Sequence, residues 1–138
     1  MADQVHFELV SPERLMFSAT VGEVIIPGTE GDFGVLAGHS NLISTVRPGV
    51  INILDEGARV TDRIFVEGGF AEVNATSCTV LAERAQKVDE IDRAKAEQAL
   101  ADAREDVADA KNDIERAIAV AALDIAEARV HALAVSVY

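Results

Sequence analysis

Apolar and polar residues alternate along the first part of the chain. Segments such as Val5 to Leu9, Val24 to Ile26 and Val60 to Val66 tend to place apolar side chains two residues apart. This period is typical of strands that bury one face, because successive side chains of a strand point to opposite sides. Glycine, proline and asparagine separate the segments, as tight turns require. The pattern predicts roughly eight to ten short strands in a sandwich or flattened barrel.

The pattern changes near residue 84. Beyond it, apolar residues recur at steps of mostly three or four, with acids and bases between them. This spacing predicts amphipathic helix. One unbroken helix would leave its apolar stripe in water, so we expect a hairpin of two helices. The turn is predicted between Asp102 and Asp113, with Asp106 or Asn112 capping the second helix. A seam that pairs with another chain is the alternative.

Composition supports the same division. All nine glycines and all three prolines lie at or before Gly69, whereas 16 of the last 54 residues are alanine. We therefore predict an α+β fold, with a β-sandwich domain at residues 1–84 and an α-helical hairpin at residues 85–138. Burying a methyl group contributes about 0.8 kcal/mol, against roughly 1.5 to 3 kcal/mol for leucine or isoleucine. The apolar contact that alanine-rich helices can make is therefore small. It is consistent both with a hairpin that docks reversibly and with one that is packed permanently.

Charge and length exclude several classes of protein. The 24 acids and 12 lysines and arginines give a net charge of −12, which repels nucleic-acid phosphates. No apolar run reaches the roughly 18 residues that span a bilayer, and the first residues resemble neither a signal nor a transit peptide. We expect a soluble protein with no nucleic-acid partner and no membrane insertion. Cys78 lies in an alternating run, so burial is expected.

The segment Ile26 to Asn41, IPGTEGDFGVLAGHSN, concentrates glycine, acids and a histidine. A phosphate-binding loop offers free amides at a helix start and, in its P-loop form, a lysine. Here Glu30 and Asp32 would repel phosphate, and no lysine precedes Lys87. The segment instead predicts a tight loop that exposes the two acids beside Phe33, as a protein contact surface would.

Catalysis has little support in the sequence. His39 and Ser40 are adjacent, but the surrounding GHSN is not the GxSxG of a nucleophile elbow. The three histidines are widely spread and show no metal-binding pairing. A small hydrolase around His39 and Ser40 is one alternative function. A β-sandwich adaptor that associates through its alanine-rich helices is another.

Two segments carry a family resemblance. The segment from Val10 to Ile53, VSPERLMFSATVGEVIIPGTEGDFGVLAGHSNLISTVRPGVINI, resembles the N-terminal signature of the epsilon subunit of F-type ATP synthases, called delta in mitochondria. The matching positions are Pro27, Gly28, Gly31, Gly34, Val35, Leu36, His39, Pro48 and Gly49. The segment FVEGGFAEVNATSCTVLAERA is similar to the family's G-G-F/I-x-E-V segment and closing strand. The helical part is similar in length and alanine content.

The resemblance implies a ten-stranded β-sandwich followed by an α-helical hairpin. It also implies a non-catalytic subunit of the rotating central stalk, bound to the gamma subunit and to the membrane c-ring. The contact positions carried over are Glu30, Gly31, Asp32, Phe33 and His39. For His39 a hydrogen bond that fixes its loop is the alternative. With no transit peptide, we expect the cytoplasmic face of a bacterial inner membrane, as a peripheral part of the complex.

The family's hairpin often blocks ATP hydrolysis through bases on its second helix, in transient contact with the alpha/beta catalytic head. Here the candidate bases are Lys111, Arg116 and Arg129, set among five acids. Repulsion by an acidic partner should weaken the contact. The resemblance therefore implies weak inhibition or none.

Some bacterial members bind ATP through a motif of the form I/L-D-x-x-R-A. This chain reads VDEIDRAK, in which Asp89 and Asp92 both have the wrong spacing to Arg93. An offset of one residue turns a helical side chain by about 100 degrees, so the groups should not converge. We expect no cofactor, and a solvated charged face at these three residues.

Overall fold

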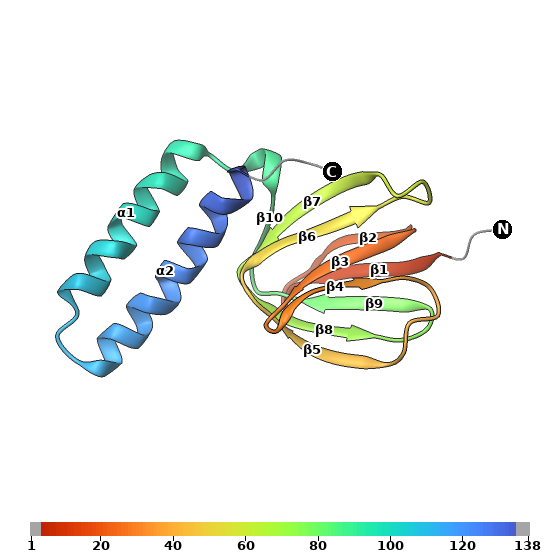
Figure 1. The fold of residues 1–138 in the computed structure, drawn as a ribbon, viewed down its shortest axis with the longest axis horizontal. Helices are drawn as coiled ribbons and strands as arrows, with labels where there is room; N and C mark the ends of the chain where they lie inside the picture. Colours follow the sequence, from red (N-terminus) through yellow and green to blue (C-terminus); the bar gives the residue numbers. More distant parts are fainter. Residues whose placement is uncertain (1–3, 135–138) are drawn as a thin grey trace.

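The computed structural model describes residues 4–134 and places a β-sandwich beside a hairpin of two helices (Figure 1). All ten strands belong to the sandwich, and the helices project from one end of it. This confirms the fold expected from the sequence. No helix among residues 4–134 is both long and apolar enough to cross a membrane.

Ten strands precede the helices. They are β1 (Val5–Val10), β2 (Leu15–Val21), β3 (Glu23–Gly28), β4 (Gly31–Val35), β5 (Leu42–Val46), β6 (Gly49–Leu54), β7 (Val60–Val66), β8 (Gly69–Val73), β9 (Ser77–Leu81) and β10 (Ala85–Lys87). The helical part begins with the 3-10 turn η1 (Val88–Glu90) and continues as α1 (Arg93–Asp109) and α2 (Asp113–Ala134).

The strands follow one another in the order β10-β7-β6-β3-β5-β8-β9-β1-β2, with β4 paired to β3. All pairs are antiparallel except β1 with β9. The β3 and β5 strands pair only where Gly28 faces Val46. This narrow link divides the path into a layer around β3, β6 and β7 and a second layer of β5, β8, β9, β1 and β2.

The inward-facing side chains of both layers form one aliphatic core. Val5, Phe7 and Leu9 of β1 are buried and alternate with more exposed residues, as the period of two predicts. Ile53 from the other layer belongs to the same cluster. Cys78 is buried there as expected, and burial raises the pKa of its thiol to about 12.

The entry to β8 requires glycine. Gly68 and Gly69 have φ angles of +118° and +152°, a region that L side chains rarely adopt. A Cβ atom on Gly69 would also collide with the carbonyl oxygen of Leu81. The absence of that atom lets β8 approach β9 closely at the position where the contact surface described below begins.

The hairpin turn falls where the sequence predicted it. The Oδ1 atom of Asn112 accepts a hydrogen bond from the Glu115 amide at 2.8 Å, which caps α2. The alternative cap, Asp106, lies inside α1. Asp92 caps α1 by accepting from the Lys95 amide at 3.1 Å.

Alanine forms the contact between the two helices. The buried residues along it are Ala96, Ala103, Ala119 and Ala126. Their small side chains let the helices lie close together but bury little apolar area. The seam is therefore as thin as the composition indicated. The domain division after residue 84 stays a prediction, and β10, at residues 85–87, pairs with β7.

Candidate functional site

An apolar row crosses the outer face of the second layer. Strand pairing places Phe70 of β8 opposite Leu81 of β9, Leu81 opposite Val10 of β1, and Val10 opposite Leu15 of β2. Residues directly opposite one another share a face of the sheet. Phe70 precedes the buried Ala71, so this face is the one turned away from the core. We call Phe70, Leu81, Val10 and Leu15 the apolar row.

The side chains of the apolar row are unusually exposed for large apolar residues. Phe70, Leu81 and Leu15 are 56%, 53% and 56% exposed, and Ile43 on the neighbouring β5 is more exposed still. A continuous patch of large apolar side chains on a sheet face marks a protein-binding surface. The sequence interpretation missed this patch because it joins two hairpins, β1–β2 and β8–β9, that are far apart in the chain.

The predicted contact loop is the turn between β3 and β4. Glu30 precedes Gly31, where β4 begins, and Asp32 and Phe33 follow within that strand. The Asp32 carboxylate accepts from the Arg47 guanidinium at 2.6 Å, and Arg47 also donates to the Gly28 carbonyl. The turn is thus tied to the end of β5. Asp32 remains more than half exposed.

The structure does not bring His39 to that turn. The β4 strand runs away from Gly31, and the Gly38 amide donates to the carbonyl of Ala75 in the β8–β9 turn at 2.7 Å. His39 therefore lies at the opposite end of β4 and β5 from Asp32. Sequence reasoning treated the whole segment as one loop, whereas Gly31–Val35 is a strand.

Neither His39 nor His6 belongs to a catalytic triad. The Nδ1 atom of His39 lies 2.6 Å from the backbone oxygen of the adjacent Ser40. On the outer face, the Nε2 atom of His6 lies 3.0 Å from Glu8 Oε1 and 3.4 Å from Ser18 Oγ. A triad needs the acid and the hydroxyl on different ring nitrogens. Among residues 4–134, no three histidine, cysteine or acidic side chains are placed to hold a metal ion.

A small second core attaches the hairpin to the sandwich. It consists of the buried Phe65, Val88 and Ala132, with the partly buried Val50, Ile91, Ile125, Ala128 and Leu133 around them. We call this set the hairpin anchor. It lies at the C-terminal end of α2, where Figure 1 shows the helix against the sandwich. The rest of the hairpin extends away from the strands (Figure 1).

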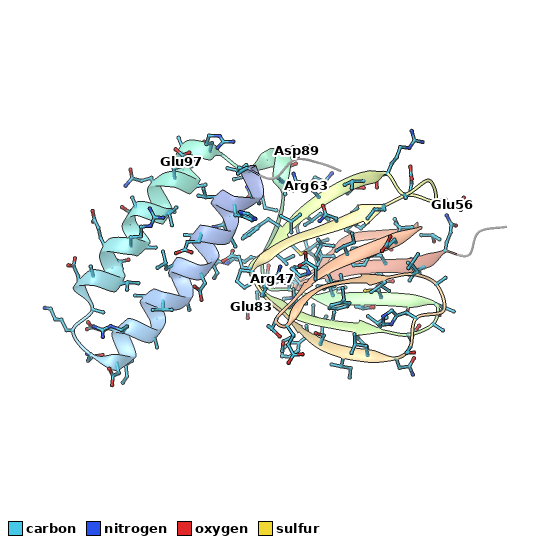
Figure 2. All side chains as sticks on the ribbon, viewed as in Figure 1. Arg47, Glu56, Arg63, Glu83, Asp89 and Glu97 are labelled. Carbon is cyan, nitrogen blue, oxygen red and sulfur yellow. The ribbon has the colours of Figure 1, made fainter. Side chains whose placement is uncertain are left out.

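Two arginines reinforce the hairpin anchor. The Arg129 guanidinium lies 3.3 Å from the Glu67 carboxylate and 4.7 Å from the centre of the Phe65 ring. The Arg63 guanidinium donates to the Ala132 carbonyl at 3.2 Å. Figure 2 labels Arg63 and Arg47 on the side of the sandwich that faces the helices. The predicted regulatory base Arg129 is thus engaged within the chain.

The other predicted regulatory bases lie at the far end of the hairpin. Lys111 is in the turn, where its amide donates to Glu115, and Arg116 donates to the Ala110 carbonyl at 3.4 Å. From Arg116 to Arg129 the helix rises by about 20 Å. The three bases therefore do not act as one cluster in this conformation.

Asp89, Asp92 and Arg93, the three residues considered for ATP binding, lie in separate local environments. Asp92 is the α1 cap, and Arg93 lies 3.8 Å from Glu97 and 3.5 Å from the Leu133 carbonyl. Asp89 lies in η1, on the surface. Nearby, a groove between α2 and the sandwich is lined by charges of both signs, namely Arg47, Arg63, Arg104, Asp32, Asp124 and Glu127.

Two family models match the chain. The model described as the ATP synthase delta/epsilon chain β-sandwich domain matches residues 4–88. The model described as the C-terminal domain of the ATP synthase epsilon chain matches residues 92–137. Together they cover nearly the whole sequence in the order in which the structure presents sandwich and hairpin.

Relatives agree in sequence and in structure. The ATP synthase epsilon chain of Maricaulis maris is 52% identical over 116 residues, which are 84% of this chain and 86% of the relative. That of Paramagnetospirillum magneticum is 49% identical and covers 97% of this chain and 100% of its own. A chain in the cryo-EM structure of the Euglena gracilis mitochondrial ATP synthase, with OSCP, F1 and the c-ring, superposes with a TM-score of 0.83 at 30% identity, covering 94% of this chain and 81% of that one.

Proposed function

Since the chain belongs to the ATP synthase epsilon chain family, we propose that it is a non-catalytic rotor subunit of the central stalk, joining the gamma subunit to the c-ring. The apolar row carries this proposal. A rotor subunit transmits torque to its neighbours, so the surfaces that bind them must be rigid. The apolar row meets this requirement because it lies on paired strands over a closed core.

The apolar row is the surface for gamma. Phe70 and Leu81 lie side by side in it, and a buried aromatic anchor is a common kind of interface hot spot. Polar Glu72 and Thr79 border them on the same face, as the rim of such an interface does. Rigid strands hold these side chains in place before binding, which reduces the entropy lost on association.

The β3–β4 turn is the surface for the c-ring, through Glu30, Gly31, Asp32 and Phe33. Its support is the exposed Asp32 carboxylate, bound by Arg47 beside the turn, with the partly buried Phe33 next to it. His39 lies at the other end of the sandwich, so its part in a gamma or c-ring contact is a separate proposal. The chain would then be peripheral to the membrane, on the cytoplasmic side of a bacterial inner membrane.

An assembly experiment tests the gamma surface. The chain is produced together with the other subunits of its ATP synthase, and the complex is purified from membranes. Phe70→Asp should weaken retention of the chain at least about thirtyfold, since it places a charge in an apolar contact. Thr61→Asp, on an exposed position of β7, is the matched control and should leave retention unchanged. Equal retention of both variants would refute the proposal.

The hairpin is proposed to inhibit ATP hydrolysis weakly or not at all, and to need no bound ATP. The first half of α2 offers Arg116 among acids, and Arg129 is engaged with Glu67. A contact of Arg129 with the alpha/beta head would first have to break its part of the hairpin anchor. A chain ending at Lys87 should therefore give the same hydrolysis rate as the full chain in the purified complex. A severalfold rise on truncation would contradict weak inhibition.

A further inference from the structure

Three strands of the sandwich pair with one neighbour only within residues 4–134, namely β10, β4 and β2. Such edge strands expose unpaired backbone groups, which proteins usually protect by short length, charged side chains or proline. The β10 strand has three residues and ends in Lys87, and β4 carries Asp32. The β2 strand, LMFSATV, has seven residues and contains no charge and no proline. Its one register shift lies near Leu15 and leaves residues 17–21 regular, so the edge is long and unprotected.

The hydrogen bonds of β1 show which backbone groups of β2 are free. The His6 amide donates at 3.0 Å to the carbonyl of the residue that precedes β9, so His6 turns its backbone groups toward β9. Backbone groups of successive strand residues point to opposite sides. Phe7 therefore faces β2, where it lies opposite Ala19, and Ala19 directs its backbone groups to β1. The N–H and C=O groups of the two neighbours of Ala19, Ser18 and Thr20, point to the free side.

The core beneath this edge is incompletely covered. Phe17 lies opposite the buried Leu9 and so faces the core, with its ring centre 5.9 Å from that of Phe7. Phe17 and Ala19 are only partly buried, because no further strand lies beyond β2 in the described part of the chain. A strand added beside β2 would cover both side chains and satisfy the free backbone groups. Strand addition of this kind is a common mode of recognition, in which main-chain hydrogen bonds supply affinity.

The position of β2 indicates which subunit supplies the added strand. Its first residue, Leu15, belongs to the apolar row that is proposed to bind gamma. Ser18 and Thr20 follow on the same strand within about 17 Å of Leu15. A gamma element seated on the apolar row can therefore continue along β2 without a break. A second copy of this chain is disfavoured, because each copy carries a net charge of −12.

We propose that the free edge of β2 binds an extended segment of the gamma subunit as an added strand. The segment forms backbone hydrogen bonds with Ser18 and Thr20, and its alternate apolar side chains pack on Phe17 and Ala19. The inference rests on the proposed function, because gamma is the partner, and it adds main-chain pairing to the side-chain contacts of the apolar row.

Hydrogen exchange of single amides tests the pairing without any substitution. The free chain is compared with the chain in the purified ATP synthase. In the free chain the amides of Ser18 and Thr20 should exchange fast, and assembly should slow both at least about tenfold. The Ala19 amide is the matched control, because it faces β1 and should be slow in both states. Equal rates at Ser18 and Thr20 in the free chain and in the complex overturn the proposal.

A proline on the free edge supplies the second readout. Thr20→Pro removes an N–H group that points away from β1, a position at which an edge strand tolerates proline. Thr20→Val keeps the N–H group and the shape of the side chain. Retention of the chain in the purified complex should fall at least about tenfold for Thr20→Pro, since a carbonyl of the added strand loses its donor, and less than about twofold for Thr20→Val. Circular dichroism of the free variants shows that both still fold. Equal retention of two folded variants contradicts the pairing.

Cross-linking identifies the occupant. A photo-cross-linker at position 20 in the purified complex should attach to gamma. Attachment to a second copy of this chain, or to a subunit other than gamma, overturns the proposal. If the unmodified chain is absent from the purified complex, the proposed function fails and this inference with it, which a gel of the same sample shows. If the chain is present but the Ser18 and Thr20 amides are unchanged, only the inference fails.

Discussion

The sandwich and the hairpin are stabilised in different ways. The sandwich closes a core in which Phe7, Leu9 and Ile26 are almost completely buried. The hairpin is joined by alanines and attached to the sandwich at one end only. High helix propensity keeps the alanine-rich segments helical without a large core. The sandwich is therefore a rigid platform and the hairpin a lightly attached arm, and we use these two names below. The binding surfaces proposed for gamma and the c-ring both lie on the platform.

The largest contrast should appear on deleting buried side chains. Phe7→Ala should lower the free energy of unfolding by about 3 to 5 kcal/mol, because it leaves a cavity in the core. Ala126→Gly in the helix seam should lower it by about 1 kcal/mol or less. Urea denaturation followed by circular dichroism measures both. Similar losses from the two substitutions would remove the distinction between platform and arm.

Removing the arginine of the hairpin anchor should release the arm without melting the platform. Arg129→Ala deletes a half-buried ion pair with Glu67 and the contact with the Phe65 ring, together about 1 to 2 kcal/mol. Hydrogen exchange should speed up in α2 and stay unchanged in β1. The exchanged pair Arg129→Glu with Glu67→Arg should recover part of the loss. Faster exchange in β1 as well would show that arm and platform unfold together.

The burial of Cys78 in the core of the platform should make the free energy of unfolding depend on pH in alkaline solution. The Cys78 thiol is protonated in the folded chain up to a pKa of about 12, whereas its ordinary value is 9.0. Above pH 9 the unfolded chain loses this proton and the folded chain keeps it, so stability falls as pH rises. Between pH 8 and pH 10 the loss should be about 1.4 kcal/mol larger than in Cys78→Val. Identical losses would mean that solvent reaches the thiol.

The smallest effect should come from the helix cap. Asn112→Ala removes the acceptor for the Glu115 amide and should destabilise the hairpin by about 1 kcal/mol. Asn112→Asp keeps an acceptor and is the control. Helical circular dichroism of the full chain on heating should show the difference. A change in the unfolding of the strands would contradict a local effect.

The sequence predicted those features that depend on neighbouring residues. Strand alternation, the alanine seam and the Asn112 cap are all visible within a few residues of one another. The apolar row could not be predicted, because Leu81 of β9 meets Val10 of β1 only through the pairing of two strands that are distant in the chain.

The engagement of Arg129 by Glu67 depends on docking in the same way, since one residue lies on α2 and the other follows β7. Asp32 and His39 were both carried over from the family resemblance as contact positions, and in the structure the strand β4 lies between them. Patterns along the chain thus predicted the elements. The surfaces could not be predicted in this way, because they depend on which strands pair and in which register.

Native-state hydrogen exchange on the free full-length chain tests the central claim most directly. The account predicts two levels of opening free energy: a high one, equal to that of global unfolding, for core amides such as those of Phe7 and Ile53, and a clearly lower one for α2. A single level shared by α2 and the core strands would contradict the distinction between a rigid platform and a lightly attached arm.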